Sequence, residues 1–272
     1  MKVKFSNRFY KKTGIKSGTV YLLTACLIFA IFSFFEVKTV PVSGNLDSTA
    51  GKRYPEPDLA EHPDFSAERM VYLTYDDGPS VNTEKLLDIL KEENVKATFF
   101  VMGGNSDYER EILCRIVEEG HAIGVHSYSH KYSKIYKSVD AFLDDFNTEY
   151  NIIKVTTGVE PKIFRFPGGS VNSYNAKIYQ NLVDEMSGRG FVFFDWNAVS
   201  DDSLGNISKD RQLAKLKSKV GKYRILMPLM HDAKQNTTTP EVTREYIKIL
   251  KENGYNFGTL NETIPPVQFS RK

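Results

Sequence analysis

Asp76 and Asp77 come directly after the apolar run 71–75 and directly before the turn-forming pair Gly78-Pro79. The run is typical of a buried strand, so both carboxylates are expected at its C-terminal tip, facing one cleft. Two carboxylates in one site seldom share a role, because like charges push their pKa values apart unless a cation intervenes. The alternative is a plain turn that caps the next helix. Three later segments favour a catalytic or metal-binding role for the two carboxylates.

Two histidines four residues apart, His126 and His130, follow the short apolar run 122–125. One helical turn would place both imidazoles on the same face. Joined by a carboxylate from another segment, such a pair can hold a divalent metal and leave positions open for water and substrate. Two surface histidines at a polar helix start are the alternative. Ser127–Ser129, between them, includes no carboxylate, so a general base must come from elsewhere.

Arg165 and His231 also lie at or near the ends of apolar runs, 162–166 and 224–230. A guanidinium at a strand tip can hold a carboxylate through two parallel hydrogen bonds and keep it ionised. The nearby Gly168 lets a backbone N–H approach a reacting oxygen. A hydrolytic site needs an acid for the leaving group, and His231 is the candidate. The alternatives are a surface arginine beside an ordinary turn and a structural histidine.

The runs that carry these residues alternate with helical patterns. Seven βα-type repeats in about 195 residues predict a parallel sheet with helices outside, either open and doubly wound or closed as a barrel. In both, ligands bind beyond the C-terminal ends of the strands. The predicted strands are 71–75, 96–101, 122–125, 162–166, 191–195, 224–230 and 256–259, and the predicted helices are 83–93, 106–119, 138–156, 173–187, 208–219 and 240–253.

The chain of 272 residues is 41% hydrophobic and 26% charged, which suits one large α/β domain with appendages and excludes a disordered protein. The first 18 residues hold six basic and no acidic residue, so the rest is slightly acidic and no nucleic-acid-binding surface is expected. Residues 19–37 are apolar without a charge before Glu36, long enough to cross about 30 Å of hydrocarbon. The basic flank, residues 1–18, is expected in the cytoplasm, with the remainder exported.

A cleaved signal peptide and a lipidated Cys26 are the alternatives to a membrane anchor. The apolar run is long, no small-residue cleavage site follows it, and the residues after Cys26 stay apolar. These observations favour an uncleaved single-pass anchor. Residues 38–69, with several prolines among polar residues, predict an extended linker. Cys114 is the one cysteine of the exported part, so no intramolecular disulfide is expected there.

The motifs together resemble those of the NodB-homology polysaccharide deacetylases, carbohydrate esterase family 4. The resemblance covers about residues 70–264 and is specific because five short motifs occur in family order. It implies a distorted (β/α)-barrel of about seven strands over residues 70–265, with 266–272 as a tail. The motifs are Thr74–Gly78, His126–His130, Arg165–Gly168, Asp195-Trp196 with Asp202, and Leu229–His231.

The resemblance implies a metal-dependent hydrolase that removes N-acetyl groups from a polysaccharide. Asp76 would be the general base, oriented by Arg165. His231 would be the acid, tuned by Asp202, although the adjacent Asp201 is an alternative for this role. The other implied roles are metal ligation by Asp77, His126 and His130, for zinc or for Co²⁺ or another divalent ion, a backbone donor at Gly168, and an apolar acetyl pocket formed by Trp196 and Leu229.

The predicted anchor would hold the catalytic domain outside the cell membrane, where it meets cell-wall glycan first. N-acetylglucosamine or N-acetylmuramic acid in peptidoglycan is therefore the expected substrate, by association. The expected partners are this polysaccharide and the membrane, and the expected state is a monomer. An acetyl-ester or other amide hydrolase on the same scaffold is one alternative. An inactive surface carbohydrate-binding module is another, and it predicts the loss of at least one metal-binding or proton-carrying residue, all of which are present.

We predict that a chain beginning at residue 38 stays monomeric in detergent-free buffer. Residues 19–37 form the one stretch that requires lipid, so their removal leaves a domain with its own core. Size-exclusion chromatography measures the outcome. Aggregation that is relieved only when residues 19–37 are restored would contradict the linker assignment.

Overall fold

The computed structural model describes residues 68–204 and 207–269. The predicted cytoplasmic tail 1–18, the anchor 19–37 and nearly all of the linker 38–69 lie outside the described residues. Within the described part, no helix combines the length and the apolar character needed to span a bilayer.

The described chain alternates strands with helices. The strands are β1 (Arg69–Val71), β2 (Thr74–Asp76), β3 (Thr98–Met102), β4 (Ala122–Ser127), β5 (Ile163–Phe164), β6 (Val192–Phe193), β7 (Ala198–Val199), β8 (Ile225–Leu226), β9 (Pro228–His231) and β10 (Tyr255–Phe257). The helices are α2 (Val81–Glu92), α3 (Asp107–Glu118), α4 (Tyr132–Ile135), α5 (Val139–Thr157), α6 (Tyr179–Gly188), α7 (Lys209–Lys217) and α8 (Thr239–Glu252), with a short 3₁₀ turn, η1 (Asp202–Leu204).

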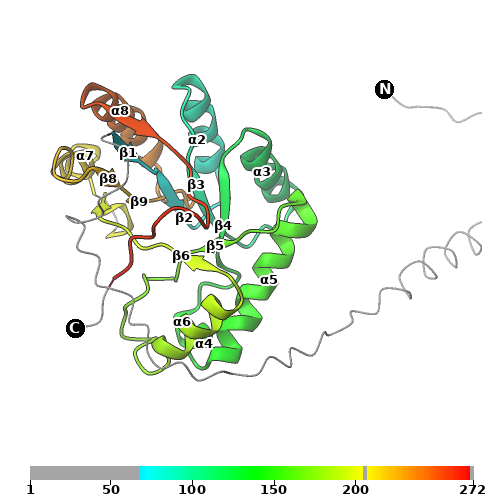
Figure 1. Cartoon of the computed structure of the whole chain (residues 1–272). Helices are drawn as coiled ribbons and strands as arrows, with labels where there is room; N and C mark the ends of the chain where they lie inside the picture. The colour runs from blue at the N-terminus through cyan, green and yellow to red at the C-terminus, as the bar shows by residue number, and fades with distance from the viewer. Residues whose placement is uncertain (1–67, 205–206, 270–272) are drawn as a thin grey trace, which may run out of the picture. The chain divides into compact units, whose positions relative to one another are not determined.

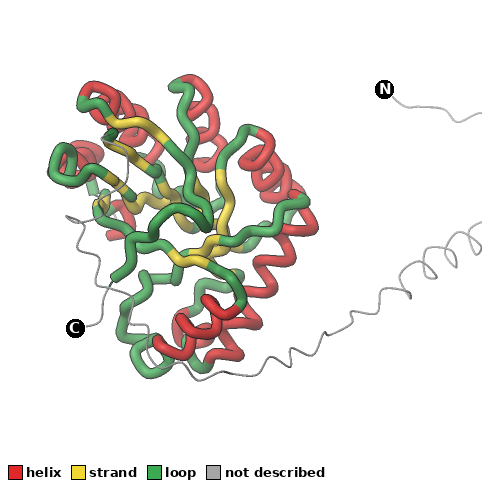
Figure 2. Tube along the Cα trace, in the orientation of Figure 1, coloured by secondary structure: helices red, strands yellow, loops and turns green. Residues whose placement is uncertain are grey.

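Seven parallel strands form the main sheet, in the order β6-β5-β4-β3-β2-β9-β7, and three more form a parallel sheet in the order β10-β1-β8. The main sheet is curled, with helices outside it (Figure 1, Figure 2). This architecture confirms the predicted (β/α)-barrel of about seven strands. The barrel is incomplete, because the edge strands β6 and β7 do not pair with each other in the described chain.

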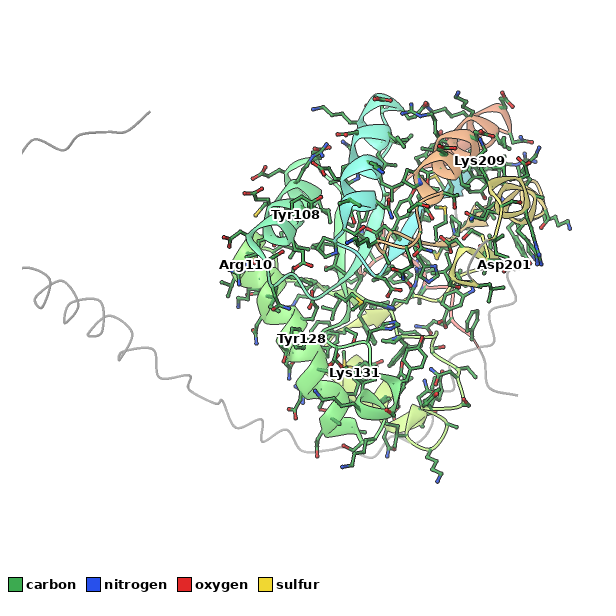
Figure 3. All side chains as sticks on the ribbon, turned by 180° about the vertical axis from the view of Figure 1, so that it is seen from behind. Tyr108, Arg110, Tyr128, Lys131, Asp201 and Lys209 are labelled. Atoms are coloured by element: carbon green, nitrogen blue, oxygen red, sulfur yellow. The ribbon has the colours of Figure 1, made fainter. Side chains whose placement is uncertain are left out.

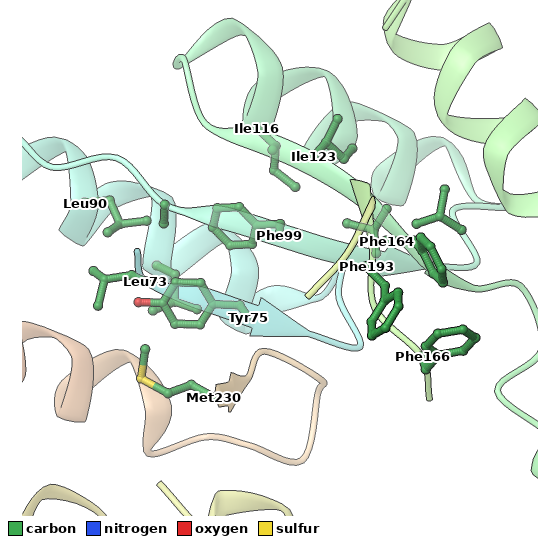
Figure 4. Packing of buried hydrophobic residues seen from close by; sticks show 14 of the residues in the cluster. Leu73, Tyr75, Leu90, Phe99, Ile116, Ile123, Phe164, Phe166, Phe193 and Met230 are labelled. Atoms are coloured by element: carbon green, nitrogen blue, oxygen red, sulfur yellow. The ribbon is translucent and has the colours of Figure 1, made fainter. Parts of the chain in front are cut away.

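Both faces of the main sheet are buried, as β3 illustrates. Phe99 and Val101 join the large cluster that contains the helix side chains, whereas Phe100 joins a smaller cluster with Leu260 and Val267. Figure 4 shows Phe99 and its neighbours in the large cluster. A strand that is covered on both faces has a continuously apolar sequence. The positions of these strands could therefore be predicted from the sequence.

The predicted strand 71–75 is wrong in one respect, because it divides into β1 and β2, which belong to different sheets. The link between them, Tyr72 and Leu73, stays buried, and the Tyr72 N–H donates to Leu226 O at 2.8 Å. The chain therefore passes from one sheet to the other without exposing a side chain. Because every residue of the run stays buried, the sequence pattern does not show where β1 ends and β2 begins. The predicted strand 224–230 divides into β8 and β9 in the same way.

The predicted helix 173–187 begins later than expected, since α6 starts at Tyr179. The Asn172 side chain accepts hydrogen bonds from the N–H groups of Tyr174 and Asn175, at 2.9 and 3.0 Å. These bonds hold the segment in a turn, an alternative to helix that asparagine favours. The one-turn helix α4 was not predicted, because four residues are too few to show a helical period.

We predict that Gly124→Ala in β4 lowers the free energy of unfolding by about 1–3 kcal/mol, the usual cost of overpacking a core. A Cβ at this position would lie 2.7 Å from the Phe100 ring and 3.0 Å from Ile163. The matched control is Gly188→Ala at the exposed end of α6, where no atom lies within 4 Å of the added carbon. Urea denaturation compares the two, and equal stabilities would refute the packing argument.

Candidate active site

Asp76 ends β2, and Asp77 begins the turn that follows it. Asp77 has a φ of 74°, a left-handed conformation that ends the strand. Both carboxylates consequently approach His126, with Asp77 Oδ1 at 3.4 Å and Asp76 Oδ2 at 3.9 Å from its Nε2. A side chain on Gly78 would overlap the carboxylate of Asp232, so this close approach requires glycine.

His126 lies in β4, and His130 lies in the connection after it with a φ of 51°. The predicted helical turn between them is therefore wrong, although the ring centres are only 5.2 Å apart. The buried carboxylate of Asp145, on α5, holds this connection by accepting from Ser127 Oγ at 2.5 Å and from the Tyr128 N–H at 2.8 Å. Figure 3 labels Tyr128 in this connection.

Asp77, His126 and His130 each offer one ligand atom, and these atoms lie within 4.8 Å of one another. The Nε2 atoms of both histidines are 3.4 Å from Asp77 Oδ1. This oxygen is buried and has no hydrogen-bond partner in the described chain, an arrangement that fits a cation between the three side chains. One carboxylate with two imidazoles is also a donor set that suits zinc.

The environment of His126 prepares it for metal binding. Its Nδ1 lies 2.9 Å from Arg165 O, which fixes the ring and leaves Nε2 as the free ligand atom. Burial lowers the pKa of His126 to about 3, so the imidazole is neutral. Neutral imidazole is the form that binds metal.

Arg165 is fully buried and contacts Asp76 through one N–H, with Nη1 2.8 Å from Asp76 Oδ1. Its other hydrogen bonds go to Thr74 Oγ1 and to the backbone oxygens of Phe194 and Asp195. The predicted two-point pairing is therefore wrong, because the guanidinium also braces the chain after β6. Burial raises the pKa of Asp76, and Arg165 limits this rise. A raised pKa makes Asp76 a stronger base.

His231 is hydrogen-bonded to Asp202. The Nδ1 atom of His231 lies 2.7 Å from Asp202 Oδ1, and the backbone N–H of His231 donates to Oδ2 at 2.7 Å. Burial by itself would lower the pKa of His231, but the bond to Asp202 and the charges of Asp202, Asp76 and Asp77 raise it to about 9. The imidazole is therefore protonated at neutral pH and can act as an acid.

Asp201, the other candidate partner for His231, pairs elsewhere. Its carboxylate lies 2.9 Å from Lys215 Nζ on α7, and Figure 3 shows Asp201 on that side of the molecule. Asp202 is buried and also accepts from Thr239 Oγ1 at 3.0 Å. The geometry therefore selects Asp202 as the partner of His231.

Gly168, Trp196 and Leu229 come from three separate segments. Gly168 is exposed, and its N–H has no hydrogen-bond partner among the residues described. The Trp196 ring packs edge to face against Phe269, with the ring centres 4.9 Å apart, although Phe269 lies in the segment 266–272 that was expected to be a tail. Leu229 alternates with buried neighbours and so shares a face of β9 with His231. An acetyl pocket formed by Trp196 and Leu229 stays a prediction.

Three buried carboxylates around the site were not predicted as functional. Asp195 accepts from the N–H groups of Ser170 and Phe269, both at 2.8 Å, and so fixes the loop that carries Gly168. Asp232 accepts a hydrogen bond from the Thr83 hydroxyl in the first turn of α2, and burial raises the pKa of Asp232 to about 7. Asp145 could have been found from the sequence, because it lies on the apolar face of its helix, where a carboxylate needs a buried partner.

Comparison with known proteins identifies the family of this chain. The sequence model of the polysaccharide deacetylases matches residues 65–219. The chain belongs to this family. This polysaccharide deacetylase is 32% identical, over 71% of its length and 70% of the relative's, to a peptidoglycan-N-acetylglucosamine deacetylase of Bacillus cereus.

Solved structures agree with this assignment. The catalytic domain of peptidoglycan N-acetylglucosamine deacetylase from Eubacterium rectale has a TM-score of 0.71 and 35% identity, covering 78% of this chain and 99% of that one. The polysaccharide deacetylase Bc1974 from Bacillus cereus has a TM-score of 0.64 and 30% identity, covering 74% and 97%. The observed fold is therefore the one found in these deacetylases.

We predict that Asp202→Asn moves the alkaline limb of the rate profile downward by about one pH unit or more. The carboxylate raises the pKa of His231, so its removal lets the imidazole lose its proton at a lower pH. The measurement is the pH dependence of kcat/KM. Asp201→Asn is the matched control and should leave the limb in place, because Asp201 pairs with Lys215. An unmoved limb in Asp202→Asn would contradict the role of His231 as acid.

Proposed function

We propose that this deacetylase hydrolyses N-acetyl groups on the N-acetylglucosamine or N-acetylmuramic acid units of peptidoglycan, using a divalent ion. Asp77, His126 and His130 would hold the ion, with zinc as the first candidate. The observation that carries this proposal is the buried Asp77 Oδ1, which has no hydrogen-bond partner in the described chain and faces two imidazole nitrogens at 3.4 Å. Asp76 and a protonated His231 remain available for proton transfer beside it.

In the proposed reaction, a water oxygen attacks the acetamide carbonyl while Asp76 accepts a proton from that water. Protonated His231 gives its proton to the departing nitrogen, the C–N bond breaks, and acetate and a free amine are released. The bound ion would supply Lewis acidity toward the water and the carbonyl oxygen. The unpaired Gly168 N–H can donate to the oxygen that gains negative charge. Arg165 holds Asp76 in place through the 2.8 Å bond.

Two features support a cell-wall substrate. Two of the similar proteins are described as peptidoglycan N-acetylglucosamine deacetylases. The apolar segment 19–37, outside the described residues, would hold the domain on the outer side of the cell membrane, next to the wall. The free amines produced would make the wall more cationic.

The substrate is tested by mass spectrometry of peptidoglycan fragments after treatment with the full chain. The expected result is a loss of about 42 Da for each acetyl group removed, assigned by fragmentation to one of the two amino sugars. Acetyl-ester cleavage on a plant xylan, with intact amides in the peptidoglycan, would favour the alternative hydrolase and reject this proposal.

We predict that Asp76→Asn retains its metal but loses turnover by about 10²- to 10⁴-fold, the range typical of general acid–base catalysis. The amide fills the same volume yet cannot accept the proton. Asp77→Asn is the matched comparison and should lose metal affinity together with activity, because three ligands leave no redundancy. Elemental analysis and kinetics are measured on both. Metal loss in Asp76→Asn with retention in Asp77→Asn would show that the two roles are reversed.

A further inference from the structure

Tyr132 opens α4 two residues after His130, and the proposed reaction leaves it without a role. Its ring meets the His130 ring edge to face at 5.1 Å and the Tyr174 ring at 5.3 Å. His130, Tyr132 and Tyr174 therefore form a continuous row of rings that begins at a candidate metal ligand.

The hydroxyl of Tyr132 lies over the backbone of Gly168. A Cβ on Gly168 would be only 3.1 Å from the hydroxyl oxygen, and the φ of 77° there also favours glycine. This hydroxyl has no hydrogen-bond partner within residues 68–204 and 207–269. The oxygen is not fully enclosed by the protein, so solvent or a ligand can reach it. The group is therefore an available donor and acceptor beside the free Gly168 N–H.

Hydrogen bonds tie the segments that carry both tyrosines to the loop around Pro167. Tyr136, directly after α4, donates its hydroxyl to Pro167 O at 2.7 Å. The Asn172 side chain donates to the same Pro167 O at 3.3 Å and accepts from the Tyr174 N–H at 2.9 Å. The rings of Tyr132 and Tyr174 are therefore carried on two connections that are both tied to this loop. A preorganised surface of this kind loses little conformational entropy when it binds a ligand.

Tyr174 is 55% exposed even though its loop is held in place. Its ring packs edge to face against Tyr132 and keeps more than half of its surface in contact with water, where a ligand can stack on it. A pyranose ring has one apolar C–H face and a polar edge, so it matches an exposed aromatic ring beside an unpaired hydroxyl. This match selects a sugar as the occupant.

We propose that Tyr132 and Tyr174 form a subsite for the sugar ring next to the reacting acetamide, with Tyr174 stacking on the apolar face and the Tyr132 hydroxyl bonding a polar edge group. This inference rests on the proposed polysaccharide deacetylase function. The subsite contributes to binding of the glycan and leaves the chemistry of the acyl group unchanged.

We predict that Tyr174→Ala and Tyr132→Phe each raise KM for an N-acetylglucosamine tetramer by about two- to tenfold, the range expected for one aromatic contact or one neutral hydrogen bond. The kcat for the tetramer and the kcat/KM for 4-nitrophenyl acetate, which has no sugar, should stay near those of the unchanged chain. Tyr223→Ala is the control, because Tyr223 is partly buried against the core, as Tyr132 is, but precedes β8 at the opposite end of the strands. Thermal melting of every variant checks folding.

Equal losses on the tetramer and the ester, or an unchanged tetramer KM in both variants, would overturn the subsite. Calorimetric titration of the tetramer into the full chain and each variant separates this inference from the proposed function. Tetramer binding that both substitutions weaken, without any deacetylation, would reject the function and retain the subsite. If the chain deacetylates the tetramer and neither substitution weakens binding, the subsite is rejected and the proposed function is retained. A chain that neither binds nor deacetylates the tetramer would overturn both.

Discussion

The buried guanidinium of Arg165 is the interaction on which the site depends. It joins Asp76 at the end of β2 to the backbone after β6, and it stacks over the Phe100 ring at 4.4 Å. Removing one partner of a buried ion pair typically costs about 3–5 kcal/mol, because the other charge is left uncompensated. Arg165 therefore makes it possible to keep the Asp76 carboxylate, which an apolar interior disfavours, at the buried end of β2.

The same fold gives two histidines opposite protonation states. His126 is buried, and desolvation outweighs the nearby carboxylate of Asp77, so its pKa falls to about 3. His231 is nearly as enclosed, but the carboxylate of Asp202 at 2.7 Å reverses the effect of burial and brings its pKa to about 9. Neighbouring carboxylates, Asp202 above all, thus give one imidazole a proton that burial removes from the other, without any difference in residue type.

The sequence located the candidate site residues that lie at the ends of buried strands. Asp76, His126 and His231 could be located because apolar runs mark strands, and parallel strands present their C-terminal ends at one edge. The left-handed backbone of His130 was not foreseeable, because it depends on the tertiary hydrogen bonds of Asp145. The contact of Phe269 with Trp196 was equally hidden, since it joins segments far apart in the chain.

The pairs that build the site are distant along the chain. Arg165 and Asp76 are 89 residues apart, whereas the three candidate metal ligands all lie between residues 77 and 130. Synthesis proceeds from the N-terminus, so the ribosome delivers the ligands well before His231 and its partner. The growing polypeptide therefore contains all three candidate ligands before it contains the candidate acid His231 and its partner Asp202.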